Sequence, residues 1–140
     1  EKAGLIADEH RNAWVIGADT SVVLDDRIYG KPKDREEAFD MLSKLLGRTH
    51  EVCGGFSILH RARGVSYSEV HSTEVKMLSL EKEEINAYID TGEPLDKAGA
   101  YGIQGIGAAL VCSVKGSYTN VMGLNAAAVF VALKRLGAVK

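Results

Sequence analysis

An acidic and a basic side chain lie close together near the start of the chain, beside two apolar runs. Asp19 and Thr20 separate the runs Trp14–Ile16 and Val22–Leu24, and Lys31 follows twelve positions after Asp19. The proline after Lys31 restricts that lysine to extended geometry. A carboxylate at a strand end can hold a divalent cation or take a proton from water, and a fixed ammonium suits phosphate oxygens. The pattern is compatible with phosphate chemistry, and it is equally compatible with a turn aspartate and a solvated lysine.

A glycine-rich segment is the second candidate region. Residues 91–107 hold five glycines, which indicates backbone freedom or the close approach of a ligand. Within it, Gly102–Gly107 reads G-x-x-G-x-G, which does not match the dinucleotide fingerprint G-x-G-x-x-G. Gln104 is the one polar side chain between Tyr101 and Ser113. A polar residue in such surroundings is expected to face solvent or to meet a specific partner.

Composition limits the class of protein. The 140 residues suit a single domain, and 46% of them are hydrophobic, which is enough for a buried core. A net charge of -2 argues against nucleic-acid or membrane-surface partners. Cys53 and Cys112 lack the spacing of a zinc site, and the simplest setting for two such cysteines is the reducing cytoplasm.

The hydrophobic pattern predicts an α/β fold that contains long hairpins. Asp34 has the character of a helix N-cap, with Glu37 as its capping-box partner, and Gly47 is expected to end that helix. We expect helices over residues 1–10, 35–46, 81–90 and 120–136, and strands over residues 13–18, 21–24, 49–60, 65–80 and 108–114.

Four stretches together resemble the Maf family of nucleoside triphosphate pyrophosphatases. They are GADTSVVLDDRIYGKP (Gly17–Pro32), MLSKLLGRTHEV (Met41–Val52), GEPLDKAGAYGIQGIG (Gly92–Gly107) and GSYTNVMGL (Gly116–Leu124). The resemblance implies an α/β fold related to Maf and ITPase proteins, with a long mixed sheet, flanking helices and two lobes around a central cleft. It also implies cleavage of a nucleotide between its α- and β-phosphates, with a divalent metal (Mg²⁺ or Mn²⁺) as cofactor.

The resemblance assigns roles to individual residues. Asp19 is similar to the family's essential acidic residue, which acts as metal ligand or general base, and Thr20 beside it is a substrate-binding candidate. Lys2 and Lys31 resemble the lysines that neutralise the triphosphate. Gln104 resembles the residue that separates the subfamilies. Because a glutamine amide offers one donor and one acceptor to the imide edge of uracil or thymine, Gln104 favours dTTP and UTP over methylated guanine nucleotides.

The sequence also departs from the family pattern. The family's N-terminal strand and its Ser-x-Ser-Pro-Arg-Arg loop have no counterpart here, so residues 1–140 are expected to form one Maf-like domain that is incomplete at its N-terminus. Gly54 stands where the family usually has threonine. The alternative function is a catalytically inactive nucleotide-binding regulator linked to cell division. The expected partner is a nucleoside triphosphate, and the sequence leaves a homodimer open.

Overall fold

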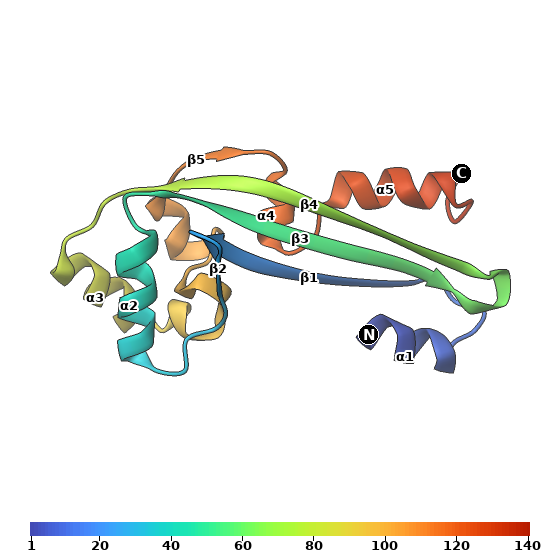
Figure 1. Ribbon diagram of the computed structural model, residues 1–140, viewed down its shortest axis with the longest axis horizontal. Helices are drawn as coiled ribbons and strands as arrows, with labels where there is room; N and C mark the ends of the chain where they lie inside the picture. Colours follow the sequence, from blue (N-terminus) through green and yellow to red (C-terminus); the bar gives the residue numbers. More distant parts are fainter.

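The computed structural model describes residues 1–140 as one long five-stranded sheet with helices at its two ends (Figure 1). The strand order is β2-β1-β3-β4-β5, and every neighbouring pair is antiparallel. None of the helices has the length and apolar character that crossing a membrane requires. In chain order the elements are α1 (Lys2–Glu9), β1 (Val15–Leu24), β2 (Arg27–Tyr29), α2 (Arg35–Leu45), β3 (Thr49–His60), β4 (Val65–Met77), α3 (Lys82–Asp90), β5 (Val111–Lys115), α4 (Tyr118–Met122) and α5 (Ala126–Arg135).

Two tight connections set the direction of the strands. Asp25 and Asp26 join β1 to β2 with φ values of 50° and 61°, as a type I′ hairpin turn requires. A short 3₁₀ turn ending at Gly64 joins β3 to β4. Such hairpins make antiparallel neighbours, whereas a parallel pair needs a long crossover. The predicted mixed sheet is therefore wrong for these residues, because the sheet is antiparallel throughout.

β1 is one continuous strand, which corrects the predicted break after residue 18. Asp19 pairs with Gly55 and Thr20 pairs with Gly54, so Asp19 lies in the middle of the strand rather than at its end. Sequence rules recognise strands by their apolar content, and the polar residues 19–21 resembled a turn for that reason. Pairing with β3 requires only backbone groups, which these residues supply as well as any others.

The predicted C-terminal helix is two helices in the structure. Ser117 caps α4 by accepting the Asn120 N–H at 3.1 Å, and Asn125 caps α5 by accepting the Ala128 N–H at 3.1 Å. Gly123, with φ of 128°, separates the two helices. The last strand also begins later than predicted, at Val111, because residues 105–110 form 3₁₀ turns.

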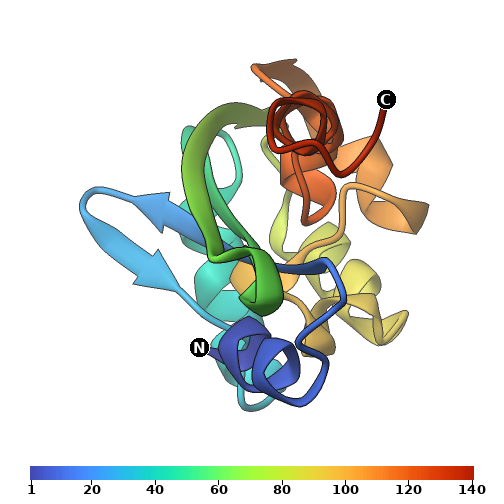
Figure 2. The ribbon, with the colours of Figure 1, turned by 90° about the vertical axis from the view of Figure 1, so that its right-hand side faces the viewer.

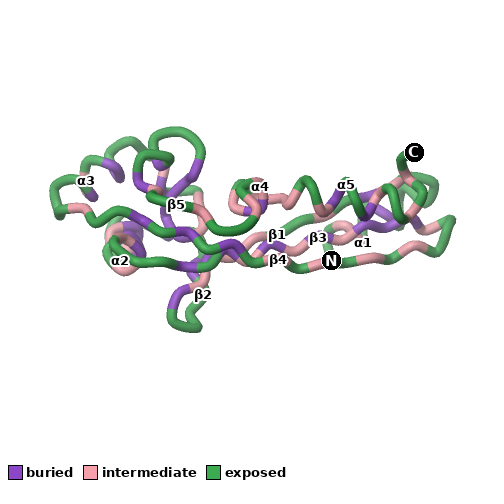
Figure 3. Tube along the Cα trace, turned by 90° about the horizontal axis from the view of Figure 1, so that it is seen from above, coloured by how far each residue is buried: buried purple, intermediate pink, exposed green.

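The main core lies at the end of the sheet that α2 and α3 cover (Figure 1). It holds 17 buried residues, and the α2 residues in it are the predicted ones, Ala38, Met41, Leu42 and Leu45. The Asp34 cap is confirmed, since its carboxylate accepts the Glu37 N–H at 2.8 Å. The colouring in Figure 3 shows buried segments around α2 and along the strands beneath it.

At the other end of the sheet, two helices cover opposite faces (Figure 1 and Figure 2). Ala7 of α1 packs with Val15 and Leu59 on one face. Val129 of α5 packs with Phe56 on the other face. Burial on both faces explains why β3 can be apolar at this end, and it leaves the middle of the sheet as the place where polar side chains gather.

Candidate functional site

Asp19 and Thr20 lie side by side on β1 and therefore project to opposite faces of the sheet. The Asp19 carboxylate accepts the Thr20 N–H at 3.0 Å. β2 pairs only with Val22–Leu24, so β1 has a free edge at both residues. A single ligand could therefore pass around this edge and contact both side chains.

Thr20 opens onto a pocket of about 340 Å³ beside the glycine-rich segment. Gln104 lines the same pocket, so the structure brings these two predicted residues together. Lys97, whose role the sequence left ambiguous, also lines it. A cavity of this size with a few polar groups on apolar walls is typical of a small-molecule site. The remaining walls come from Val22, Val52, Ala98, Tyr101, Gly102, Ile103, Val121 and Met122.

Asp19 lines a second pocket of about 490 Å³ on the other face, beside the first turn of α1. Lys2 lines it too, so these two predicted residues also come together. Glu1 and Glu69 add two more carboxylates to its wall. The close approach of α1 depends on Gly17, where a Cβ would lie 2.6 Å from the Cβ of Ala3.

Lys31 lines neither pocket. It is exposed in the loop after β2, which is tied to the glycine-rich segment by a 3.1 Å hydrogen bond from the Gly99 N–H to the Gly30 carbonyl. The pKa of the Asp96 carboxyl is lowered, chiefly by its hydrogen bond from Lys97 and more weakly by the charge of Lys31. The structure thus places Lys31 on the Gln104 side of the molecule rather than beside Asp19.

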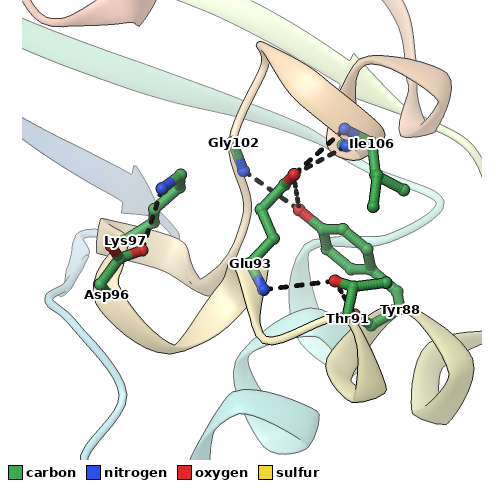
Figure 4. A network of polar contacts seen from close by, with 8 residues as sticks. Tyr88, Thr91, Glu93, Asp96, Lys97, Gly102 and Ile106 are labelled. Carbon is green, nitrogen blue, oxygen red and sulfur yellow. Dashed lines mark hydrogen bonds and ion pairs between the residues drawn. The ribbon is translucent and has the colours of Figure 1, made fainter.

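The loop that carries Gln104 is held by Glu93, a residue that sequence analysis missed (Figure 4). Its carboxylate accepts the Ile106 and Gly107 N–H groups at 3.0 and 2.8 Å and the Tyr88 hydroxyl at 2.7 Å. The signal was present in the sequence, because five glycines expose backbone N–H groups that need an acceptor nearby.

Comparison with known proteins identifies the family. The profile of the family described as Maf-like protein matches residues 1–136. The chain belongs to the Maf family. It is 49% identical over 132 residues to a dTTP/UTP pyrophosphatase of Syntrophotalea carbinolica, with 94% of this chain and 60% of that protein covered. It is 53% identical over 124 residues to a dTTP/UTP pyrophosphatase of Thermoanaerobacter sp. (strain X514), with 88% of this chain and 64% of that protein covered. The Maf chain thus spans about three fifths of the length of these relatives.

The charge state of the Glu93 network follows from its contacts. Burial alone would raise the pKa of Glu93, but the hydrogen bonds from Tyr88, Gly107 and Ile106 outweigh it and hold that pKa below its usual value. Burial, and then the hydrogen bond to Glu93, raise the pKa of Tyr88. At neutral pH this Maf chain therefore holds a carboxylate against a protonated phenol.

A second buried contact stiffens the wall of the Gln104 pocket. The Nε2 atom of His50 lies 2.6 Å from the Tyr101 hydroxyl, and Tyr101 lines the pocket. The Nδ1 atom of His50 has no hydrogen-bond partner. Burial lowers the pKa of His50 to about 4, so the ring is neutral at pH 7. His50 does not line the pocket and reaches it only through Tyr101, so its role here is structural.

The donor set around Asp19 limits what kind of metal site this Maf chain can form. No three His, Cys, Asp or Glu side chains converge into a cage. Mg²⁺ in nucleotide-processing sites usually binds one or two carboxylates and completes its shell with phosphate oxygens and water. The exposed Asp19 carboxylate, next to Lys2, fits that kind of site and does not fit a fully protein-ligated one.

Proposed function

We propose that this chain hydrolyses dTTP and UTP to the monophosphate and pyrophosphate. The observation that carries the proposal is the pocket shared by Thr20 and Gln104, in a chain whose relatives are named dTTP/UTP pyrophosphatases. The Gln104 amide offers a donor and an acceptor to the N3–H and carbonyl groups of uracil or thymine. A glutamate there would offer acceptors only, which suits the adjacent N–H donors of guanine.

The free edge of β1 suggests how one nucleotide could use both pockets. With its base beside Thr20 and Gln104, its triphosphate would cross the edge of β1 toward Asp19 and Lys2. The two pockets would then be the two halves of the cleft that the family resemblance implies. The sugar and the first phosphate would then lie beside the glycine-rich segment. Lys31 would add positive charge from that side.

The chemistry proposed for Asp19 is positional and electrostatic. Asp19 would orient the attacking water and take its proton, while Lys2 and Lys31 neutralise charge on the phosphates. A bound Mg²⁺ or Mn²⁺ would supply further neutralisation of the phosphate oxygens. Asp19 is the residue that would hold this cation, with the nucleotide supplying most of its remaining ligands.

Pyrophosphate release tests the proposal. The panel contains dTTP, UTP, CTP, ATP, GTP and 7-methyl-GTP, each with Mg²⁺ or Mn²⁺. Two proteins are assayed: this chain, and this chain preceded by the N-terminal segment of the Thermoanaerobacter relative. Release from dTTP and UTP by either protein supports the function. Binding of UTP without release by either one supports the inactive nucleotide-binding regulator, and the absence of both overturns a nucleotide site.

The assembly state and cellular location of the protein stay predictions. The sequence leaves a homodimer open, and the cysteine pattern favours the cytoplasm. Sedimentation velocity of the purified chain over a range of concentrations tests for the dimer.

A further inference from the structure

We propose that Glu93 is a positioning residue for nucleotide recognition: its carboxylate fixes the backbone on both sides of Gln104 and so sets where the Gln104 amide meets the base. This inference rests on the proposed function, because it concerns how the same pocket reads a pyrimidine. Glu93 and Tyr88 line neither pocket, so they would act through the loop that carries Gln104 and not by contact with the nucleotide.

The hydrogen bonds of the network involve residues on both sides of Gln104 in the sequence, and Figure 4 shows Gly102 and Ile106 among them. On its C-terminal side, the Ile106 and Gly107 N–H groups donate to the two carboxylate oxygens of Glu93 at 3.0 and 2.8 Å. On its N-terminal side, the Gly102 N–H donates to the Tyr88 hydroxyl at 3.2 Å, and that hydroxyl donates to Glu93 at 2.7 Å. The loop is therefore held two residues before and two residues after Gln104.

The glycine pattern of the loop matches the space that the Glu93 network leaves. Gly105 has φ of 72°, and a Cβ on it would lie 2.7 Å from Oε2 of Glu93. A Cβ on Gly107 would lie 2.6 Å from the Tyr88 hydroxyl and 2.8 Å from Oε1 of Glu93. Gly105 and Gly107 of the G-x-x-G-x-G sequence, which matches no dinucleotide fingerprint, thus leave room for the carboxylate. The Gly102 carbonyl lies closer still to a Cβ on Gly107, and a Cβ on Gly102 would meet the Lys97 side chain instead.

The network is anchored to the main core. Tyr88 belongs to α3 and is buried among the core residues. The Glu93 N–H donates to the Thr91 hydroxyl at 3.2 Å, and that hydroxyl donates to the Tyr88 carbonyl at 2.6 Å. The backbone and the carboxylate of Glu93 are both hydrogen-bonded to residues at the end of α3. A rigid helix, and not a free loop, therefore fixes the position of Gln104.

Replacing Glu93 by glutamine keeps the size of the side chain and changes only its capacity to accept hydrogen bonds. A carboxylate accepts from all three donors, whereas a glutamine amide has one acceptor oxygen and must turn its NH₂ group toward a backbone N–H. We expect Glu93→Gln to raise the KM for UTP on the order of tenfold while kcat changes about twofold or less, since Gln104 contacts the base and not the reacting phosphates. The preference for UTP over CTP should fall as well.

A double-mutant cycle shows whether Glu93 acts through Gln104. The KM for UTP is measured for Glu93→Gln in the wild-type and Gln104→Ala backgrounds, using whichever protein of the pyrophosphate panel is active. If Glu93 positions Gln104, its effect disappears once the Gln104 amide is gone. Glu84→Gln is the matched control, because the Glu84 carboxylate accepts the Glu81 N–H at 2.8 Å at the start of α3, away from the loop.

Amide hydrogen exchange gives a readout that does not require turnover. We expect Glu93→Gln to speed exchange at Ile106 and Gly107, and Glu84→Gln to leave both unchanged. An unaltered KM in Glu93→Gln, or an equal rise in the Gln104→Ala background, overturns the inference while the proposed function stands. If the wild-type protein binds UTP without hydrolysing it and Glu93→Gln weakens that binding, the proposed hydrolysis is overturned and the inference about Glu93 stands. A wild-type protein that neither hydrolyses nor binds UTP overturns both.

Discussion

Replacing Gly54 by alanine should destabilise the whole sheet, because the Asn120 side chain lies directly over this glycine. A Cβ at Gly54 would lie 2.9 Å from Cγ of Asn120 and closer still to its Oδ1. The same amide group donates from Nδ2 to the Val52 carbonyl at 3.1 Å, the His71 carbonyl at 3.3 Å and the Thr73 hydroxyl at 3.2 Å. The added methyl group can be accommodated only if these hydrogen bonds break.

The size of the effect follows from the two N–H groups of the amide. Loss of the hydrogen bond that each N–H group donates costs about 1 kcal/mol, and a buried carbonyl left without a partner adds about 1 kcal/mol more. We therefore expect Gly54→Ala to lower the free energy of unfolding by about 3 kcal/mol and the Tm by about 10 °C. Val121 and Met122, which follow Asn120 and line the Gln104 pocket, should also shift, so the KM for UTP should rise.

Urea unfolding followed by circular dichroism measures this cost. Gly55→Ala is the matched control on the same strand, since a Cβ there meets its nearest atoms at 3.7 Å, an ordinary contact. The penalty of Gly54→Ala should also vanish in an Asn120→Ala background, where the obstructing amide is absent. Equal stability of the Gly54 and Gly55 variants, or the same penalty with and without Asn120, would refute the reasoning.

Three further predictions concern the site. Asp19→Asn should abolish pyrophosphate release from UTP while leaving the unfolding free energy within about 0.5 kcal/mol, because Asp19 is exposed. Gln104→Glu should lower kcat/KM for dTTP and UTP at least about tenfold relative to GTP, because a glutamate offers no donor to the base. His50 should make unfolding pH-dependent: its pKa is about 4 in the folded protein and 6.5 in the unfolded chain. The unfolded chain then binds more protons between these values, so stability is complete above pH 6.5 and falls by about 3 kcal/mol as the pH drops to 4.

Each of these predictions has its own contradicting result. Near-normal turnover in Asp19→Asn would remove its catalytic role, and an unchanged substrate ranking in Gln104→Glu would remove base reading by the amide. For the pH dependence, His50→Gln keeps a partner for the Tyr101 hydroxyl but cannot titrate. Its unfolding free energy should change less between pH 6.5 and 4.5 than that of the wild type, and an identical slope would show that other groups carry the effect.

Local physical chemistry was enough to predict much of the fold. The bounds of β3, the Asp34 cap and the buried face of α2 follow from patterns that span a few residues. The motifs also identified the family, because they are short and contiguous in the sequence. Errors occurred where polar residues continue a strand, as at residues 19–21, and where one glycine divides an apolar helix, as at Gly123.

The arrangement of the candidate site depends on contacts between residues far apart in the chain. Pairing of β1 with β3, and the short reach of β2, decide that Asp19 and Thr20 face different pockets across a free edge. Hydrogen bonds from residues 102–107 to Tyr88 and Glu93 hold the backbone on which Gln104 lies. The sequence determines which side chains are available, since charge and hydrogen-bonding capacity are local properties. Only the tertiary structure decides which of them meet, because strand register and loop anchoring are set by partners elsewhere in the chain.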